Sequence, residues 1–191
     1  MYTFETHITV ECTSKELYKT FQEVCEQLKV KPIIINVLVD NQVMTSGIVK
    51  AKDKQKVIEI IKQQSDVLLK HGIVPLRLKI EAEPKYIKDT QSSFYYSEVH
   101  LLMDTDVLNC VSQLPIELHK SSNEFKPGYT FLTYRKVFDI TPDIKKLMKW
   151  SEDIHNASYK ALTSKQRKCN VEFAIFDTNQ ELDKEWMSLR T

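Results

Sequence analysis

Histidines that alternate with carboxylates and hydroxyls are the residues of this sequence best suited to chemistry. The first stretch of this kind, FETHITVE, carries at every second position Glu5, His7, Thr9 and Glu11. Alternate side chains of a strand share one face, so we expect these polar groups on one face and the mostly apolar residues between them on the other. Imidazole titrates near neutral pH. Three of the five histidines fall inside predicted strands, namely His7, His100 and His119.

Two short motifs of the form H-x-[ST] occur on predicted strands, His7-Ile8-Thr9 and His119-Lys120-Ser121. The pair resembles the paired motif of the 2H phosphoesterases, two-lobed proteins with pseudo-symmetric strands. The resemblance covers these two tripeptides and implies that His7 and His119 form an acid–base pair while Thr9 and Ser121 bind phosphate. In-line displacement at phosphorus needs such a pair, because one proton leaves the nucleophile and another reaches the leaving oxygen.

Alternation places further polar side chains on the same strand faces. The candidate ligand-binding residues are Glu5, Thr9, Arg77, Lys79, Glu81, Glu98, His100, Ser121 and Arg135. The cations among them could bind an anion through charge-assisted hydrogen bonds in a pocket without catalysis. A solvated sheet face with cross-strand polar pairs is the structural alternative.

A metal site is a further alternative from the same strands. Two histidines and two carboxylates, His7, Glu81, His100 and Glu172, come from the first and last strand of each half. Such a set can hold a divalent metal. It is similar to the set used by the vicinal-oxygen-chelate enzymes, although their modules lack the second helix predicted below.

The C-terminal stretch FDTNQELDKEW places Asp177, Asn179 and Asp183 near one another. It lacks the glycine and glutamate of an EF-hand loop. We therefore predict a turn followed by a short helix that docks Trp186.

Periodicity predicts the elements that carry these residues. TSKE at 13–16 predicts the start of a helix that ends near Leu28, and two apolar β-branched runs after Pro32 predict a hairpin. Asp53 caps a second predicted helix that ends at Gly72, and a strand follows in PLRLKIEAE. The order is β-α-β-β-α-β.

The same order returns after residue 93, where Glu98-Val99-His100-Leu101 matches Glu5-Thr6-His7-Ile8. We predict two fused ferredoxin-like repeats of the α+β class, with antiparallel sheets whose polar faces form a central cleft or barrel. The repeats span residues 1–84 and 94–191, the second with a C-terminal extension, and residues 85–93 form a connector.

The composition of the sequence excludes several classes of binding partner. A net charge of +1 makes nucleic acid an unlikely partner, and three glycines are too few for a glycine-rich dinucleotide or nucleotide loop. The sequence lacks a long apolar segment, and its four scattered cysteines fit a reduced, cytoplasmic protein without membrane contact.

These observations together predict a function. We expect a small phosphorylated or other anionic ligand in the cleft between the repeats, with hydrolysis of a phosphoester as the reaction if the protein is an enzyme. Neither anion binding nor this hydrolysis requires a cofactor. The alternatives are the divalent metal site and a non-catalytic binding or interaction protein.

Overall fold

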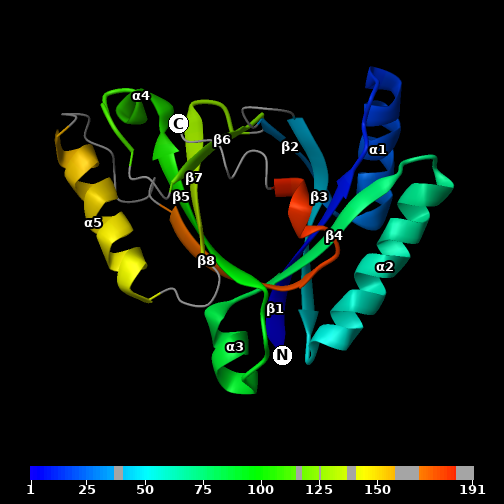
Figure 1. Ribbon diagram of the computed structural model, residues 1–191. Helices are drawn as coiled ribbons and strands as arrows, with labels where there is room; N and C mark the ends of the chain where they lie inside the picture. The colour runs from blue at the N-terminus through cyan, green and yellow to red at the C-terminus, as the bar shows by residue number, and fades with distance from the viewer. Residues whose placement is uncertain (37–40, 115–117, 125, 137–140, 158–167, 184–191) are drawn as a thin grey trace.

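The strands of the computed structural model join in one closed antiparallel barrel (Figure 1). The structure describes residues 1–36, 41–114, 118–124, 126–136, 141–157 and 168–183. Its eight strands are β1 (Tyr2–Val10), β2 (Lys31–Asn36), β3 (Asn41–Ala51), β4 (Pro75–Ala82), β5 (Tyr96–Asp104), β6 (His119–Asn123), β7 (Tyr129–Lys136) and β8 (Lys168–Asp177). The order around the barrel is β1-β3-β2-β6-β7-β5-β8-β4, and β4 pairs with β1 to close it.

Helices cover the outside of the barrel in two groups. The five α-helices of the described residues are α1 (Lys15–Leu28), α2 (Lys54–Lys70), α3 (Pro84–Thr90), α4 (Thr105–Leu108) and α5 (Thr141–Ala157). In Figure 1, α1 and α2 lie on one side of the barrel, α4 and α5 on the other, and α3 beneath it. A short 3₁₀ helix, η2 (Gln180–Asp183), follows β8.

The helix ends follow from local chemistry. The Ser14 side chain accepts a hydrogen bond from the Leu17 N–H at the start of α1, and Asp53 caps α2 in the same way through Lys56 N–H. Beyond α2, Gly72 adopts a φ of 76°, in the left-handed region that glycine tolerates best. The predicted ends of these helices, near Leu28 and at Gly72, are therefore confirmed.

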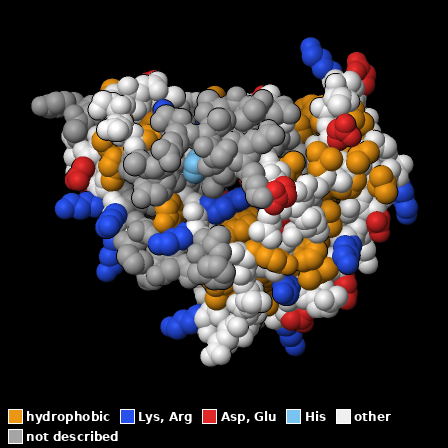
Figure 2. Space-filling model, viewed as in Figure 1, with side chains coloured by type: hydrophobic (Ala, Val, Ile, Leu, Met, Phe, Trp, Pro, Cys, Tyr) orange, Lys and Arg blue, Asp and Glu red, His pale blue; other side chains and the backbone are white. Residues whose placement is uncertain are grey.

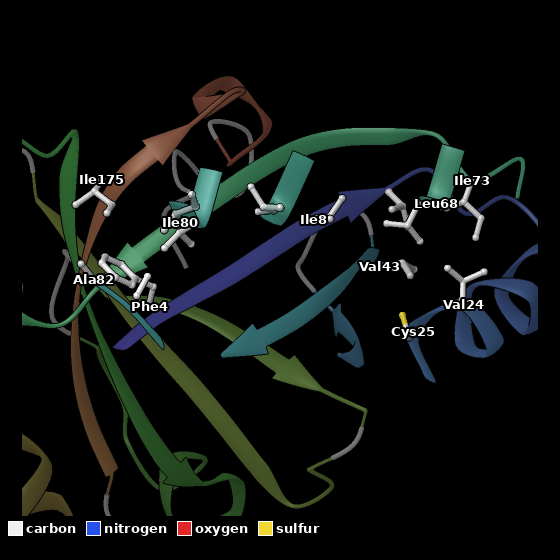
Figure 3. Packing of buried hydrophobic residues seen from close by; sticks show 14 of the residues in the cluster. Phe4, Ile8, Val24, Cys25, Val43, Leu68, Ile73, Ile80, Ala82 and Ile175 are labelled. Atoms are coloured by element: carbon white, nitrogen blue, oxygen red, sulfur yellow. The ribbon is translucent and has the colours of Figure 1, made fainter. Parts of the chain in front are cut away.

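The main hydrophobic core lies between the barrel wall and α1 and α2. Phe4 and Ile8 of β1, Ile80 of β4, and Val24 and Leu68 of the two helices belong to it, as Figure 3 shows. A second cluster on the other side joins β5 and β7 to α4, with Trp150 and Ile154 of α5 packed against it. Because the apolar face of each strand meets helices, its polar face must line the barrel interior.

The predicted fold is wrong. The described residues form a closed eight-stranded antiparallel barrel with five α-helices, not two fused ferredoxin-like repeats with separate sheets. The pairings of β4 with β8 and of β2 with β6 join the two halves into one sheet. Closure satisfies backbone groups that separate sheets would leave unpaired at their edges. Alternation assigns side chains to faces, but it contains no information on which edges pair.

Other local predictions need smaller corrections. The predicted connector 85–93 is mostly helical, since α3 covers Pro84–Thr90. Helix α4 occupies the place of the first predicted helix of the second half, but it has only four residues. Trp186, predicted to dock through the C-terminal segment, lies outside the described residues.

The described surface is of mixed character. Figure 2 shows hydrophobic side chains gathered on the side formed by α1, α2 and the start of β4, where Leu69, Val74 and Leu76 are exposed. Among the described helices, none combines the length and the apolar character needed to cross a bilayer.

Candidate functional site

Two groups of the same composition meet inside the barrel. Each combines an E-x-H pair from the first strand of one half with a glutamate from a neighbouring strand. Strand register places Glu5 opposite Glu81 and Glu98 opposite Glu172. The two groups are Glu5, His7 and Glu81, and Glu98, His100 and Glu172.

His7 is held by hydrogen bonds at both ring nitrogens. Its Nδ1 lies 3.1 Å from the carbonyl oxygen of Thr45, and its Nε2 lies 3.1 Å from Glu81 Oε2. A carbonyl only accepts, so Nδ1 must carry a proton, and the carboxylate favours a second proton on Nε2. Burial lowers the pKa of His7, but the hydrogen bond and the charge of Glu81 outweigh it and raise that pKa. The raised pKa and the two acceptors favour the imidazolium form, in which Nε2 donates to Glu81 Oε2 and orients it.

His100 has a different environment. Its Nδ1 lies 3.0 Å from the Thr133 hydroxyl, which can either donate or accept. Its Nε2 lies 3.5 Å from Glu172 Oε2 and 3.7 Å from Glu98 Oε2. When Nδ1 donates to Thr133, Nε2 is left with a lone pair that can bind a metal.

Lys79 connects the two groups. Its ammonium lies 2.6 Å from Glu81 Oε1 and 2.6 Å from Glu98 Oε2. Although burial opposes its charge, these carboxylates raise the pKa of Lys79 well above the ordinary value. Glu81 Oε1 is buried and, despite this ion pair, accepts no hydrogen bond of good geometry among the described residues. Lys79 therefore compensates Glu81 by charge alone at that oxygen.

Glu172 has no such compensation from a contacting lysine or arginine among the described ion pairs. Burial, followed by the charges of Glu81 and Glu5, raises its pKa to about 9 despite the opposing effect of Lys79. Because the neighbouring carboxylates disfavour a further negative charge, the carboxyl of Glu172 keeps its proton at neutral pH. Donor atoms of Glu81, His100 and Glu172 lie within 4.8 Å of one another.

A second network surrounds Arg77. Its guanidinium forms two hydrogen bonds with Asp177, at 2.9 and 2.6 Å, and one with Asp183 at 2.7 Å. The Tyr96 hydroxyl accepts from Arg77 Nη2 at 2.7 Å and donates to Asp177 at 2.6 Å. Arg135 contacts Asp183 and Glu98 and lies over the Tyr96 ring, 4.1 Å from its centre. All these groups are buried or nearly so.

The described interior carries more acidic than basic groups. Its lysine and arginine side chains in ion pairs with carboxylates are Arg77, Lys79 and Arg135, and His7 lies beside Glu81. Their carboxylate partners are Glu81, Glu98, Asp177 and Asp183, and Glu5 and Glu172 lie nearby. Each predicted anion-binding cation thus already has an internal carboxylate partner. This charge balance favours an added cation over an added anion.

The structure places the proposed acid–base histidines on different parts of the barrel. His7 is on β1 and His119 on β6, with β3 and β2 between these strands. His119 lies opposite Thr133, which in turn lies opposite His100. Burial and the nearby Arg135 charge lower the pKa of His119.

The two hydroxyl residues predicted to bind phosphate are both buried. Thr9 lies opposite Arg77 in the pairing of β1 with β4, and Ser121 lies opposite Phe131 in the pairing of β6 with β7. The roles assigned to these residues stay predictions.

Sequence reasoning missed Tyr96 and the pairing of Asp177 and Asp183 with arginines. The available signal was Arg77 itself, because an arginine on the strand face that lines a closed interior is buried and then needs carboxylate partners. Asp177 and Asp183 were noted only as neighbours within the C-terminal stretch.

Comparison with known proteins adds nothing to this picture: no protein-family model, curated protein sequence or solved structure matches the chain.

Proposed function

We propose that the barrel interior binds one divalent transition-metal ion through Glu81, His100 and Glu172. The observation that supports the proposal is that donor atoms of Glu81, His100 and Glu172 lie within 4.8 Å of one another. Burial and acidic neighbours raise the pKa of Glu172 to about 9, which agrees with a site that lacks a compensating cation. A divalent cation would take the place of the Glu172 proton and neutralise the surrounding carboxylates. A mixed set of imidazole and carboxylate ligands suits Zn²⁺ or Mn²⁺.

The geometry requires a small adjustment. Two donors on opposite sides of an ion with bonds of about 2.0–2.2 Å are at most about 4.4 Å apart. The widest separation in the set is up to 4.8 Å, so side-chain motion of a few tenths of an ångström closes the site. His7, which contacts Glu81 Oε2, and Thr133, which contacts His100, would orient two of the three ligands.

An anionic ligand would bind through this metal. Three protein ligands leave coordination positions open for a water molecule or a ligand oxygen. The site can be reached, because the side chains of Glu5 and His100 are 30% and 27% exposed. At the metal site, the ion would offset the acidic interior for a small phosphorylated or other anionic ligand. For hydrolysis of a phosphoester, the protonated His7 would supply a proton to the leaving oxygen.

Calorimetric titration of metal-free protein with MnCl₂ and with ZnCl₂ tests the proposal. We expect one ion per chain and, at pH 7, release of about one proton, measured by repeating the titration in buffers of different ionisation enthalpy. Glu172→Gln and His100→Ala should weaken binding by more than the roughly 10–100-fold that loss of an outer-shell partner costs.

Glu59→Gln is the matched control, since Glu59 is 48% exposed and pairs only with Lys56 among the described ion pairs. Equal affinities for the control and the ligand variants, or no binding by the wild type at millimolar metal, would refute the proposal.

A further inference from the structure

Asp183, which does not belong to a barrel strand, places its carboxylate against two guanidinium groups of the barrel interior. Asp183 belongs to η2, which follows the last strand, and it is the buried residue of that element. Its Oδ2 accepts hydrogen bonds from Arg77 Nη1 and Arg135 Nη2, and its Oδ1 accepts from Gln42 Nε2 at 3.4 Å. Burial opposes the charge of Asp183, but the two arginines lower its pKa to about 2. The carboxylate is therefore fully ionised.

Both guanidinium groups are held in place without Asp183. Arg77 keeps two hydrogen bonds to Asp177 and one to Tyr96. Arg135 keeps its bond to Glu98 at 2.8 Å and its stacking on Tyr96. Because these partners lie on the barrel strands, removal of Asp183 would leave a preformed pair of donors aimed at one point.

The other residues of η2 bury little apolar surface. Gln180 and Glu181 are exposed and Leu182 is partly exposed. The backbone bond from Leu182 N–H to Asn179 O is long, at 3.4 Å. An element with few buried apolar groups opens at a lower free-energy cost than the strands around it.

We propose that Arg77 and Arg135 form a binding site for a small carboxylate ligand, and that Asp183 is an internal carboxylate that occupies this site until a ligand displaces it. Exchange of one carboxylate for another leaves the charge of the interior unchanged, whereas an additional anion would increase its acidic excess. The site is distinct from the ligand set of the proposed metal and does not require a metal. A tethered competitor has an effective concentration in the millimolar range or above, so the wild type binds free carboxylates weakly.

Thermal unfolding of metal-free protein in EDTA tests the proposal. Sodium acetate should raise the melting temperature of Asp183→Ala in a saturable way, by roughly 3–5 °C at about ten times its dissociation constant, relative to sodium chloride at equal ionic strength. The wild type and Glu181→Ala, which removes an exposed carboxylate of the same helix, should show much smaller shifts. Hydrogen exchange of the wild-type Leu182 amide should accelerate at high acetate, because displacement of Asp183 releases η2.

Equal acetate shifts in Asp183→Ala, Glu181→Ala and the wild type would overturn the proposal, as would no shift in any of them. Stronger stabilisation of Asp183→Ala by phosphate than by acetate would overturn the assignment to carboxylates. If Asp183→Ala fails to fold, Asp183→Asn replaces it, and unchanged Leu182 exchange in the wild type would show that Asp183 is a fixed structural contact. Since EDTA removes divalent metal, failure here leaves the metal proposal untouched.

Discussion

Glu98 on β5 lies directly opposite Glu172 on β8, and the two carboxyls titrate at opposite ends of the pH range. Burial opposes ionisation of both. Lys79 and Arg135 outweigh it at Glu98 and lower its pKa to about 2. At Glu172, burial and neighbouring carboxylates prevail and raise the pKa to about 9. Two glutamates in register thus differ because the interior cations contact only one of them.

Glu172→Gln should change how stability depends on pH. The folded-state pKa of Glu172 is raised from 4.5 to about 9, so the folded protein binds more protons than the unfolded chain between these values. The free energy of unfolding therefore falls as pH rises through this window. Glutamine stays neutral, so the variant should melt several degrees above the wild type at pH 8 and close to it at pH 5.

The measurement is melting temperature from pH 5 to 9 for both proteins. His7, whose pKa is also raised, loses its stabilising contribution as pH rises, but it does so in both proteins. Parallel curves for the wild type and Glu172→Gln would contradict the assignment of a neutral Glu172.

Arg77→Met should destabilise the fold strongly. It leaves Asp177 and Asp183 buried without their main partner, which typically costs about 3–5 kcal/mol for a buried pair. Melting temperature should fall by roughly 10 °C. Adding Asp177→Leu to this variant should recover part of the loss, whereas Lys56→Gln in an exposed pair should have little effect. A small loss in Arg77→Met would mean that the network contributes little to stability.

The face assignment of the strands could be predicted from alternation. Phe4 and Ile8 pack against helices, whereas Glu5 and His7 turn toward the interior group, as the opening pattern indicated. Members of the predicted metal set also meet, since donors of Glu81, His100 and Glu172 gather within 4.8 Å and His7 contacts Glu81. Short-range periodicity is sufficient to assign each of these residues to the interior face, because that assignment depends on one strand alone. The meeting of Glu81 with His100 and Glu172 also depends on the pairing of β4 with β8, which periodicity does not specify.

Strand closure and the position of Asp177 could not be predicted in the same way. Glu172 and Asp177 are an odd number of residues apart on β8, so alternation places them on opposite faces. A register shift between Ile80 and Glu81 in the pairing of β4 with β8 brings both to the interior. Such bulges, and the edge pairings that close the barrel, depend on contacts between distant segments.

His7→Ala tests whether the barrel is an enzyme. If a phosphodiester is hydrolysed in the presence of Mn²⁺, loss of the protonated His7 should reduce kcat by about 10²–10⁴-fold, the usual effect of removing a proton-transfer group. His71→Ala, which changes a histidine at the end of α2, should retain activity. Equal turnover in His7→Ala and the wild type would exclude His7 from proton transfer, and His119→Ala in the same assay tests the other half of the predicted pair.

Lys79→Gln should weaken the metal-free fold and strengthen metal binding. Lys79 compensates Glu81 and Glu98, both nearly fully buried, so its loss leaves two carboxylates without this partner and lowers the melting temperature in EDTA. The same ammonium repels a cation bound at Glu81, so its removal should increase Mn²⁺ affinity, by about tenfold for each 1.4 kcal/mol of repulsion relieved. Saturating Mn²⁺ should therefore raise the melting temperature of Lys79→Gln more than that of the wild type.

Two measurements on Lys79→Gln and the wild type test this prediction: calorimetry gives the Mn²⁺ affinity, and thermal unfolding with and without Mn²⁺ gives the melting temperatures. Weaker Mn²⁺ binding by Lys79→Gln than by the wild type would mean that Lys79 organises the ligands rather than competing with the ion.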